Sequence, residues 1–327
     1  MLRNRNLNIE ALHVYMMFLI VVLYITGSYL DIEDVRQCCS LNMGWLLGYR
    51  SLTFLGVSTF AFISGYYGVK LHLDKVFAME IMAISYGVFV LVALYVHVGH
   101  ISMGTVRDLL FPITSNHLWY FSGYMILILI SPFLNEGIKV LSKKMYFKTL
   151  TLLIVLICGF RFISGGANAD FLNLLVVYLT GRYLRIYPCE ALIKRSTEVL
   201  FSCLIVNFLI SFSLGCMGMG KLNLIFEGNN NPFTVLGAIS LFYSFLKMKK
   251  VSYLNRIVSF FAPYMLAVYV FHELLRTEGL IDFAVYKGNI LFVFPLALVI
   301  VITISLIERG RVFLIRPLTG KINKYLV

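Results

Sequence analysis

The stretch that decides the fold is residues 11–30, which read ALHVYMMFLIVVLYITGSYL. It contains no Asp, Glu, Lys or Arg, and it is about as long as a helix that crosses the hydrocarbon core of a bilayer. Nine further apolar runs of similar length follow it, so the chain is predicted to cross a membrane repeatedly. These runs are residues 52–69, 76–96, 117–134, 147–163, 171–187, 199–216, 232–247, 258–276 and 288–307.

The basic residues of the connecting segments fall mostly on one side of the predicted membrane. With the N-terminus in the cytoplasm, 21 of the 28 Lys and Arg residues lie in cytoplasmic segments, and the acidic residues Asp31, Glu33 and Asp34 lie outside. Cytoplasmic loops of membrane proteins carry such an excess of Lys and Arg. The sequence therefore predicts an all-α polytopic membrane bundle of about ten transmembrane helices, with both termini cytoplasmic.

The composition excludes a water-soluble fold, because 60% of the 327 residues are hydrophobic and only 13% are charged. The net charge of +12 arises from short cytoplasmic segments, where topology and anionic headgroups account for it, so membrane lipid is an expected partner and nucleic acid is not. No linker separates the spans, so residues 1–327 are expected to form a single domain. A signal peptide at residues 1–30 is the alternative for the first span, but its apolar stretch is longer than usual for one.

The six cysteines show no zinc-ligand spacing, and no metal site or bound cofactor is expected. Cys38 or Cys39 can reach Cys216, which is also predicted near the outer face. Apolar filling of the core is the alternative role for most of the six.

One face of the first predicted helix is polar. At about 100° per residue, Glu10, His13, Tyr24 and Ser28 project from the same side, and His13 and Tyr24 are about 16 Å apart along the axis. Ionisable groups inside a bilayer are costly and indicate function by default. The alternative is that Glu10 and His13 lie among the headgroups and that Tyr24 is a hydrogen-bonded core residue.

A second polar group closes the ninth span, where Tyr269, His272 and Arg276 share a face and Glu273 can pair with Arg276. Trp119 and Tyr124 lie near the start of the fourth span, at the outer face. An interfacial belt of aromatic and charged residues is the alternative for both groups.

Several motifs, in order along the chain, resemble those of the acyltransferase-3 family of membrane acyltransferases. The resemblance spans nearly the whole chain, and ten spans with both ends inside is also the usual arrangement of that family. The motifs are NIEAL at 8–12, FAFISGY at 60–66, HLWY at 117–120 with Tyr124, ISPFLN at 130–135, YLTG at 178–181 and VYVFHE at 268–273.

The resemblance implies transfer of an acyl group, most often acetyl, from cytoplasmic acyl-CoA to a sugar hydroxyl of a surface polysaccharide or its lipid-linked precursor. The family carries an Arg and, after ten residues, a catalytic His on its first helix. Aligned through residues 8–10, these positions hold His13 and Tyr24. We therefore expect Glu10, His13 and Tyr24 to be the catalytic residues, with His13 as the base and Tyr24 as a hydrogen-bond donor.

The remaining site residues follow from the same resemblance. Lys70 and Lys75 are the first candidates to bind the phosphates of acyl-CoA, although they also fit the topology signal. The acceptor glycan is expected to bind on the outer side, and the bacterial inner (plasma) membrane is the expected location. A non-catalytic relative of the family and a polysaccharide flippase or polymerase are the alternatives. The residues expected to bind the acceptor are Tyr269, His272, Glu273, Trp119, Tyr124 and Arg161.

Overall fold

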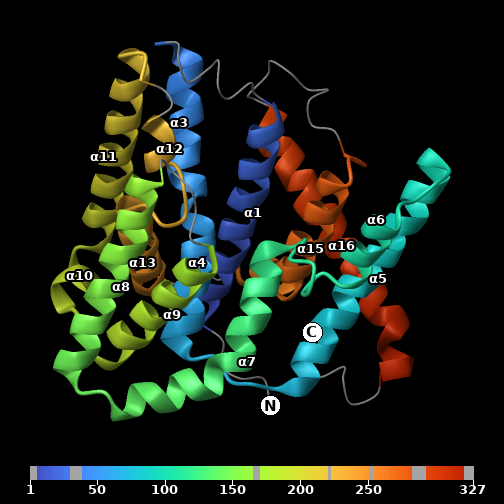
Figure 1. The fold of residues 1–327 in the computed structure, drawn as a ribbon, viewed down its shortest axis with the longest axis horizontal. Helices are drawn as coiled ribbons and strands as arrows, with labels where there is room; N and C mark the ends of the chain where they lie inside the picture. Colours follow the sequence, from blue (N-terminus) through green and yellow to red (C-terminus); the bar gives the residue numbers. More distant parts are fainter. Residues whose placement is uncertain are drawn as a thin grey trace.

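The computed structural model describes residues 6–29, 39–164, 170–219, 222–249, 254–281 and 292–319, and these form helices without a β-strand (Figure 1). The elements are α1 (Leu7–Tyr29), α3 (Leu41–Thr53), α4 (Leu55–Tyr67), α5 (Leu73–Val98), α6 (Met103–Leu110), α7 (Trp119–Val140), α8 (Lys143–Ile163), α9 (Asp170–Ile186), α10 (Glu190–Lys194), α11 (Ser196–Cys216), α12 (Asn223–Phe226), α13 (Pro232–Lys247), α14 (Leu254–Phe261), η2 (Ala262–Tyr264), α15 (Met265–Thr277) and α16 (Val293–Thr319).

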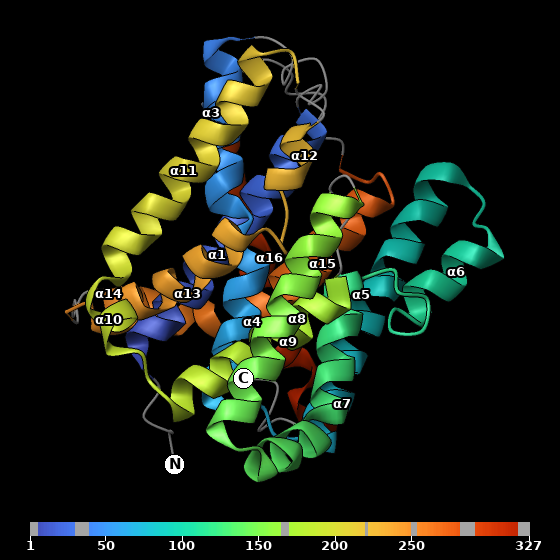
Figure 2. The ribbon, with the colours of Figure 1, turned by 60° about the vertical axis from the view of Figure 1, so that its left-hand side comes forward.

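Helix α1 lies in the middle of the bundle (Figures 1 and 2). It packs against α3, α4, α13, α14, α15 and α16, and Leu12, Met16, Val21 and Val22 are fully buried. These six neighbouring helices shield much of the surface of α1 from lipid. The polar residues of α1 therefore face other helices rather than lipid.

Large apolar side chains cover the outside of the bundle. Phe89 on α5, Leu152 on α8 and Phe201 on α11 are all exposed. Water would disfavour such a surface, whereas lipid tails match it. Within the part of the chain that the structure describes, eight helical segments are long and apolar enough to cross a membrane, which confirms the predicted all-α polytopic membrane bundle.

Each of the ten predicted spans overlaps a helix of the structure. Two of them correspond to the shorter helices α9, of 17 residues, and α13, of 16 residues. The count of ten crossings and the cytoplasmic position of both termini stay predictions. Residues 31–34 and Cys38 lie outside the described residues.

The second span begins earlier than predicted. Residues 41–51, expected within an outer loop, belong to α3, and α3 and α4 together make a helical segment from Met43 to Tyr67 that is interrupted at Phe54. The charge of Arg50 is the reason why the sequence predicts a loop here. Its charge is tolerated there because its guanidinium forms a buried ion pair with Glu227.

The ninth span is interrupted rather than continuous. The 3₁₀ turn η2 separates α14 from α15. Pro263 lies in this turn, and proline cannot donate the backbone hydrogen bond that a continuous α-helix needs. The break sets the direction of α15, which carries Tyr269 and His272.

Helices α4 and α9 approach each other at two glycines. A Cβ atom on Gly65 would collide with the carbonyl group of Tyr178, and one on Gly181 would collide with the backbone of Phe62 and Tyr66. Small residues let helix backbones approach this closely in membranes. The glycines of the FAFISGY and YLTG motifs thus serve helix packing.

Cys39 and Cys216 form a disulfide that joins the start of α3 to the end of α11, across 177 residues of sequence. Their Cα atoms are 4.5 Å apart, within the range that a disulfide requires. Cys158, Cys189 and Cys203 are free thiols.

Candidate functional site

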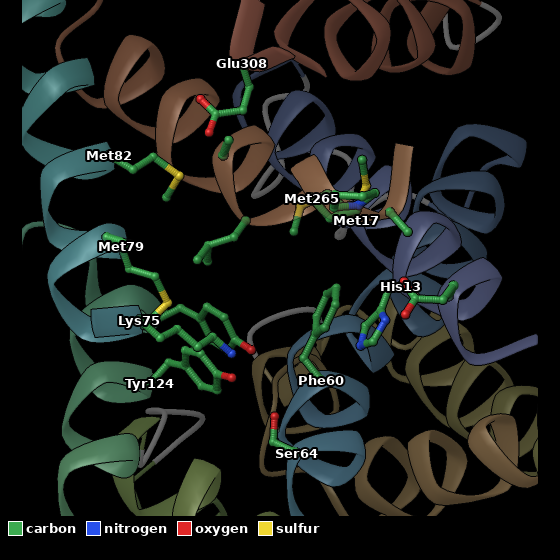
Figure 3. A pocket seen from close by; sticks show the side chains of 17 residues that line it. His13, Met17, Phe60, Ser64, Lys75, Met79, Met82, Tyr124, Met265 and Glu308 are labelled. Atoms are coloured by element: carbon green, nitrogen blue, oxygen red, sulfur yellow. The ribbon is translucent and has the colours of Figure 1, made fainter. Parts of the chain in front are cut away.

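The larger of two cavities along α1 lies near the N-terminal half of that helix and has a volume of about 320 Å³. We call it the His13 cavity. Glu10, His13 and Met17 of α1 line it together with Phe60 and Ser64 of α4. The opposite wall comes from α5, and Figure 3 shows Lys75, Met79 and Met82 there, facing His13 and Phe60.

The imidazole of His13 is held against an aromatic ring in this cavity. It stacks on Phe60 with 5.5 Å between ring centroids and 11° between planes. Lys75 supplies a cation on the far side, and Met17, Met79, Met82 and Met265 make the wall apolar. Methionine side chains are flexible and fill irregular space, so this cavity can accept a flexible chain with a polar end.

Glu308 on α16 is a carboxylate of the His13 cavity that sequence reasoning missed. Tyr86 donates a hydrogen bond of 2.6 Å to it, and Arg311 donates two, from Nε at 2.6 Å and Nη2 at 2.7 Å. The predicted tenth span ended at residue 307, and Arg311 was counted as a topology signal. The spacing of Glu308 and Arg311 by three residues was the available sign of a pair.

The second cavity lies farther along α1 and has a volume of about 170 Å³. We call it the Tyr24 cavity. Its aromatic wall comes from Tyr24, Trp119 and Tyr269, and its polar wall from Asp170 and Asn229. Tyr120 of α7 lines both cavities. The two spaces therefore meet at one buried side chain.

His272 on α15 is 1% exposed and lies against Tyr24, with 5.3 Å between the ring centroids. Its Nδ1 is 2.6 Å from the carbonyl oxygen of Val268. Because a carbonyl oxygen only accepts, Nδ1 carries the hydrogen and Nε2 carries the lone pair. Nε2 is buried and has no hydrogen-bond partner among the described residues. The neutral ring of His272 therefore has a lone pair on Nε2 that can accept a proton.

Arg276 and Glu273 complete this group. The guanidinium carbon of Arg276 lies 4.9 Å from the centroid of the Tyr24 ring. Its Nε and Nη2 donate to the two carboxylate oxygens of Glu273 at 2.9 and 2.8 Å. The predicted pairing of these two residues is thus present, and it places a cation over the face of Tyr24.

A second ion pair ties the entrance of α7 to the end of α15. His117 Nε2 lies 3.1 Å from Oε1 of Glu278. Burial raises the pKa of the Glu278 carboxyl, and the nearby His117 partly counteracts this effect.

The residues predicted as one first-helix site belong to two different places. Glu10 and His13 meet Lys75 and Tyr124 in the His13 cavity, whereas Tyr24 meets Trp119 and Tyr269 in the Tyr24 cavity. Four further predicted residues lie outside both linings: Lys70, Arg161, His272 and Glu273. Among the described residues, no group of three or more His, Cys, Asp or Glu side chains can hold a metal ion.

Comparison with known families decides the ancestry of this arrangement. A family model described as an acyltransferase domain matches residues 11–308. The chain belongs to the acyltransferase-3 family. It is therefore a membrane protein of an acyltransferase family, and all residues that line the two cavities, except Glu10, fall within the matched domain. No curated protein and no solved structure matches the chain.

Proposed function

We propose that the protein transfers an acyl group, with acetyl as the first candidate, from cytoplasmic acyl-CoA to a hydroxyl on a sugar of a surface polysaccharide or its lipid-linked precursor. The observation that carries this proposal is the pair of cavities of different chemistry that meet at Tyr120. A transferase needs one site for a donor and another for an acceptor, with the reacting atoms brought together between them.

The His13 cavity suits the donor. The arm of acyl-CoA is long and flexible and ends in a thioester, and four methionines offer it an adaptable apolar wall. Lys75 stands at the same cavity and supplies a cation for the phosphates. Lys70 is exposed and outside the lining, so Lys75 is the preferred of the two predicted lysines.

Two features at opposite ends of the bundle support the proposed cytoplasmic and outer sides. The segments near the N-terminal end of α1 carry the basic residues of the chain, as expected for the cytoplasm. The disulfide between Cys39 and Cys216 lies toward the opposite end (Figure 1), and disulfides persist in oxidising compartments such as the bacterial periplasm. Reporters fused after Arg195 should therefore be cytoplasmic, and reporters fused after Gly218 external.

The reaction requires a base and a donor for the oxyanion. The acceptor oxygen attacks the thioester carbonyl carbon, a C–O bond forms, the C–S bond breaks, and the CoA thiolate leaves. We assign the base to Nε2 of His272 and the oxyanion donor to the hydroxyl of Tyr24, which His272 contacts. His272 then returns the proton to the leaving thiolate.

The test is turnover by purified protein in lipid nanodiscs, supplied with radiolabelled acetyl-CoA and surface polysaccharide from cells that lack the protein. Acceptor-dependent release of CoA thiol, with label on the polysaccharide, is expected. In parallel, cells lacking the protein should have less acetyl on their polysaccharide. No turnover together with an unchanged acetyl content would instead support a non-catalytic member of the family.

A further inference from the structure

The segment between α11 and α13 brings an unusual run of polar residues into the bundle. Residues 227–231 read EGNNN, and the side chains of Glu227, Asn229, Asn230 and Asn231 are buried. Burying amides and a carboxylate at the level of a membrane is costly unless each is hydrogen-bonded. The contacts of this segment, which we call the EGNNN loop, therefore show what it is built to hold.

Arg161 is the main clamp of the loop. It is 1% exposed, and its guanidinium donates to the carbonyl oxygens of Leu224 and Ile225 and to Oδ1 of Asn230. Gly228 leaves room for it, because a Cβ atom there would collide with the guanidinium. These contacts give Arg161 a positioning role for the loop, and its role in binding the acceptor stays a prediction.

The last two asparagines of the loop are used as anchors. Asn230 donates to the carbonyl oxygen of Ile157 at 2.9 Å, and Asn231 donates to Oδ1 of Asn207 at 2.7 Å. Asn229 differs from both. Its backbone carbonyl is held by Ser58 Oγ at 3.0 Å, and Asn229 is the one residue of the loop that lines the Tyr24 cavity. The loop is rigid, and Asn229 is the residue that it presents.

Asp170 stands beside Asn229 in the lining of the Tyr24 cavity. Its Oδ1 is buried and has no hydrogen-bond partner among the described residues. Arg161 is close enough to interact electrostatically with this carboxylate. A buried acceptor without a donor costs stability, so a ligand hydroxyl is the group that this position fits.

We propose that the Tyr24 cavity binds one sugar ring, through hydrogen bonds from ring hydroxyls to Asp170 and Asn229 and through stacking of the apolar ring face on Trp119. That this sugar is the acyl acceptor rests on the function proposed above. At about 170 Å³ the cavity is smaller than the roughly 300–1,000 Å³ of sites for drug-sized ligands. It therefore holds a single residue of a glycan and not a chain.

The two tryptophans of the chain, Trp45 and Trp119, allow a test that needs no turnover. Trp45 is 52% exposed and stacks on Tyr49, outside the lining of both cavities. Trp45→Phe leaves Trp119 as the one tryptophan of the chain, whose emission can be excited selectively over that of tyrosine. Titration of this variant with the methyl glycosides of glucose, galactose, mannose and N-acetylglucosamine should change the emission saturably for at least one of them.

In this background, Asp170→Asn should raise the Kd of the bound glycoside by about 10- to 100-fold, as expected for a hydrogen bond to a charged group. Asn229→Ala should raise it by about 3- to 10-fold. Glu190→Gln is the matched control, because Glu190 is exposed on α10 and lies outside both linings. It should leave the Kd unchanged. Thermal unfolding of each variant checks that the fold is retained.

Three outcomes would overturn the proposal: no response to any of the four glycosides, a response that survives both Asp170→Asn and Asn229→Ala, or an equal response to Ca²⁺ alone. The outcome is separable from that of the proposed function. Sugar binding without acyl transfer would refute the transferase and keep the sugar site. Acyl transfer with an unaltered acceptor KM in both Asp170→Asn and Asn229→Ala would support the transferase and refute the sugar site.

Discussion

The His13 cavity and the Tyr24 cavity share the side chain of Tyr120, yet their remaining walls are built differently. Methionines from three helical segments shape the first, and aromatic rings with Asp170 and Asn229 shape the second. Methionine walls adapt to a flexible guest, whereas aromatic and hydrogen-bonding walls recognise one shape. Under the proposed function, we therefore expect the His13 cavity to tolerate variation in its ligand and the Tyr24 cavity to be selective.

The two cavities also differ in what holds them in place. Behind the Tyr24 cavity stands the EGNNN loop, clamped by Arg161 and by the ion pair of Arg50 with Glu227. Behind the His13 cavity, Glu308 is held by Tyr86 and Arg311. Buried polar networks whose members are satisfied make a site rigid, and the denser network lies behind the Tyr24 cavity.

The largest expected effect comes from removing the proposed base, His272, which packs against Tyr24. His272→Asn keeps a donor near the position of Nδ1, which can still bond to Val268, but removes Nε2. We expect the turnover number to fall by about 10²–10⁴-fold, the contribution typical of a positioned general base. The Kd of acyl-CoA should not change.

His100→Gln is the control for that substitution, because His100 is exposed. The dependence of turnover on pH distinguishes a base from a structural histidine. Loss of the limb of the profile that reports the base is expected in His272→Asn. An unaltered turnover number in His272→Asn would indicate that His13, and not His272, is the base.

The second effect in size is expected for Tyr24→Phe, which removes only the hydroxyl. Turnover should fall by about 10²–10³-fold, as for loss of one oxyanion donor, and thermal stability should stay close to that of the parent. His13→Ala sharpens the comparison, because His13 lies in the other cavity and its loss should raise the KM for acyl-CoA. Equal effects of both variants on both substrates would mean that the cavities act as one site.

A smaller effect is expected at the donor side. Lys75→Ala should raise the KM for acyl-CoA by about 10-fold or more, the loss expected for a hydrogen bond to a charged group, with little change in acceptor KM. Lys70→Ala is the matched control on the same cytoplasmic segment. If Lys70→Ala weakens donor binding as much as Lys75→Ala does, general surface charge explains both.

The smallest effect is expected at the ion pair of His117 and Glu278. Burial raises the pKa of Glu278 in the folded state, so the stability tied to its protonated form is lost as pH rises through the folded pKa. Glu278→Gln cannot ionise and escapes this loss. Thermal unfolding should show the variant at least as stable as the parent at neutral pH, with the difference vanishing at acidic pH. A variant clearly less stable at neutral pH would show that attraction to His117 outweighs burial.

The helices that sequence predicted well are those whose apolar runs lack charge. Residues 11–30 correspond to α1 because hydropathy and span length are local properties. Residues 41–51 are predicted as loop from the sequence, because Arg50 within them is compensated by Glu227, which is 177 positions away. No local pattern reports such a partner.

The candidate site shows the same contrast between local sequence patterns and contacts with residues distant in sequence. Sequence reasoning found His13, Tyr24, His272 and Lys75 because ionisable and aromatic residues in membrane spans stand out. It missed Asn229 because consecutive asparagines after a glycine are typical of an exposed turn. Their burial depends on Arg161, and no spacing in the sequence connects the two.

By itself the sequence determined a helical membrane bundle, its family and the residue types available for chemistry, because hydropathy, length and ordered motifs are written locally along the chain. The tertiary structure alone decided that His13 and Tyr24 face separate cavities, that His272 meets Tyr24, and that Arg161 holds the loop presenting Asn229. The physical reason is that a cavity and a buried polar pair are made by helices distant in sequence, whose approach depends on close packing at positions such as Gly65 and Gly181.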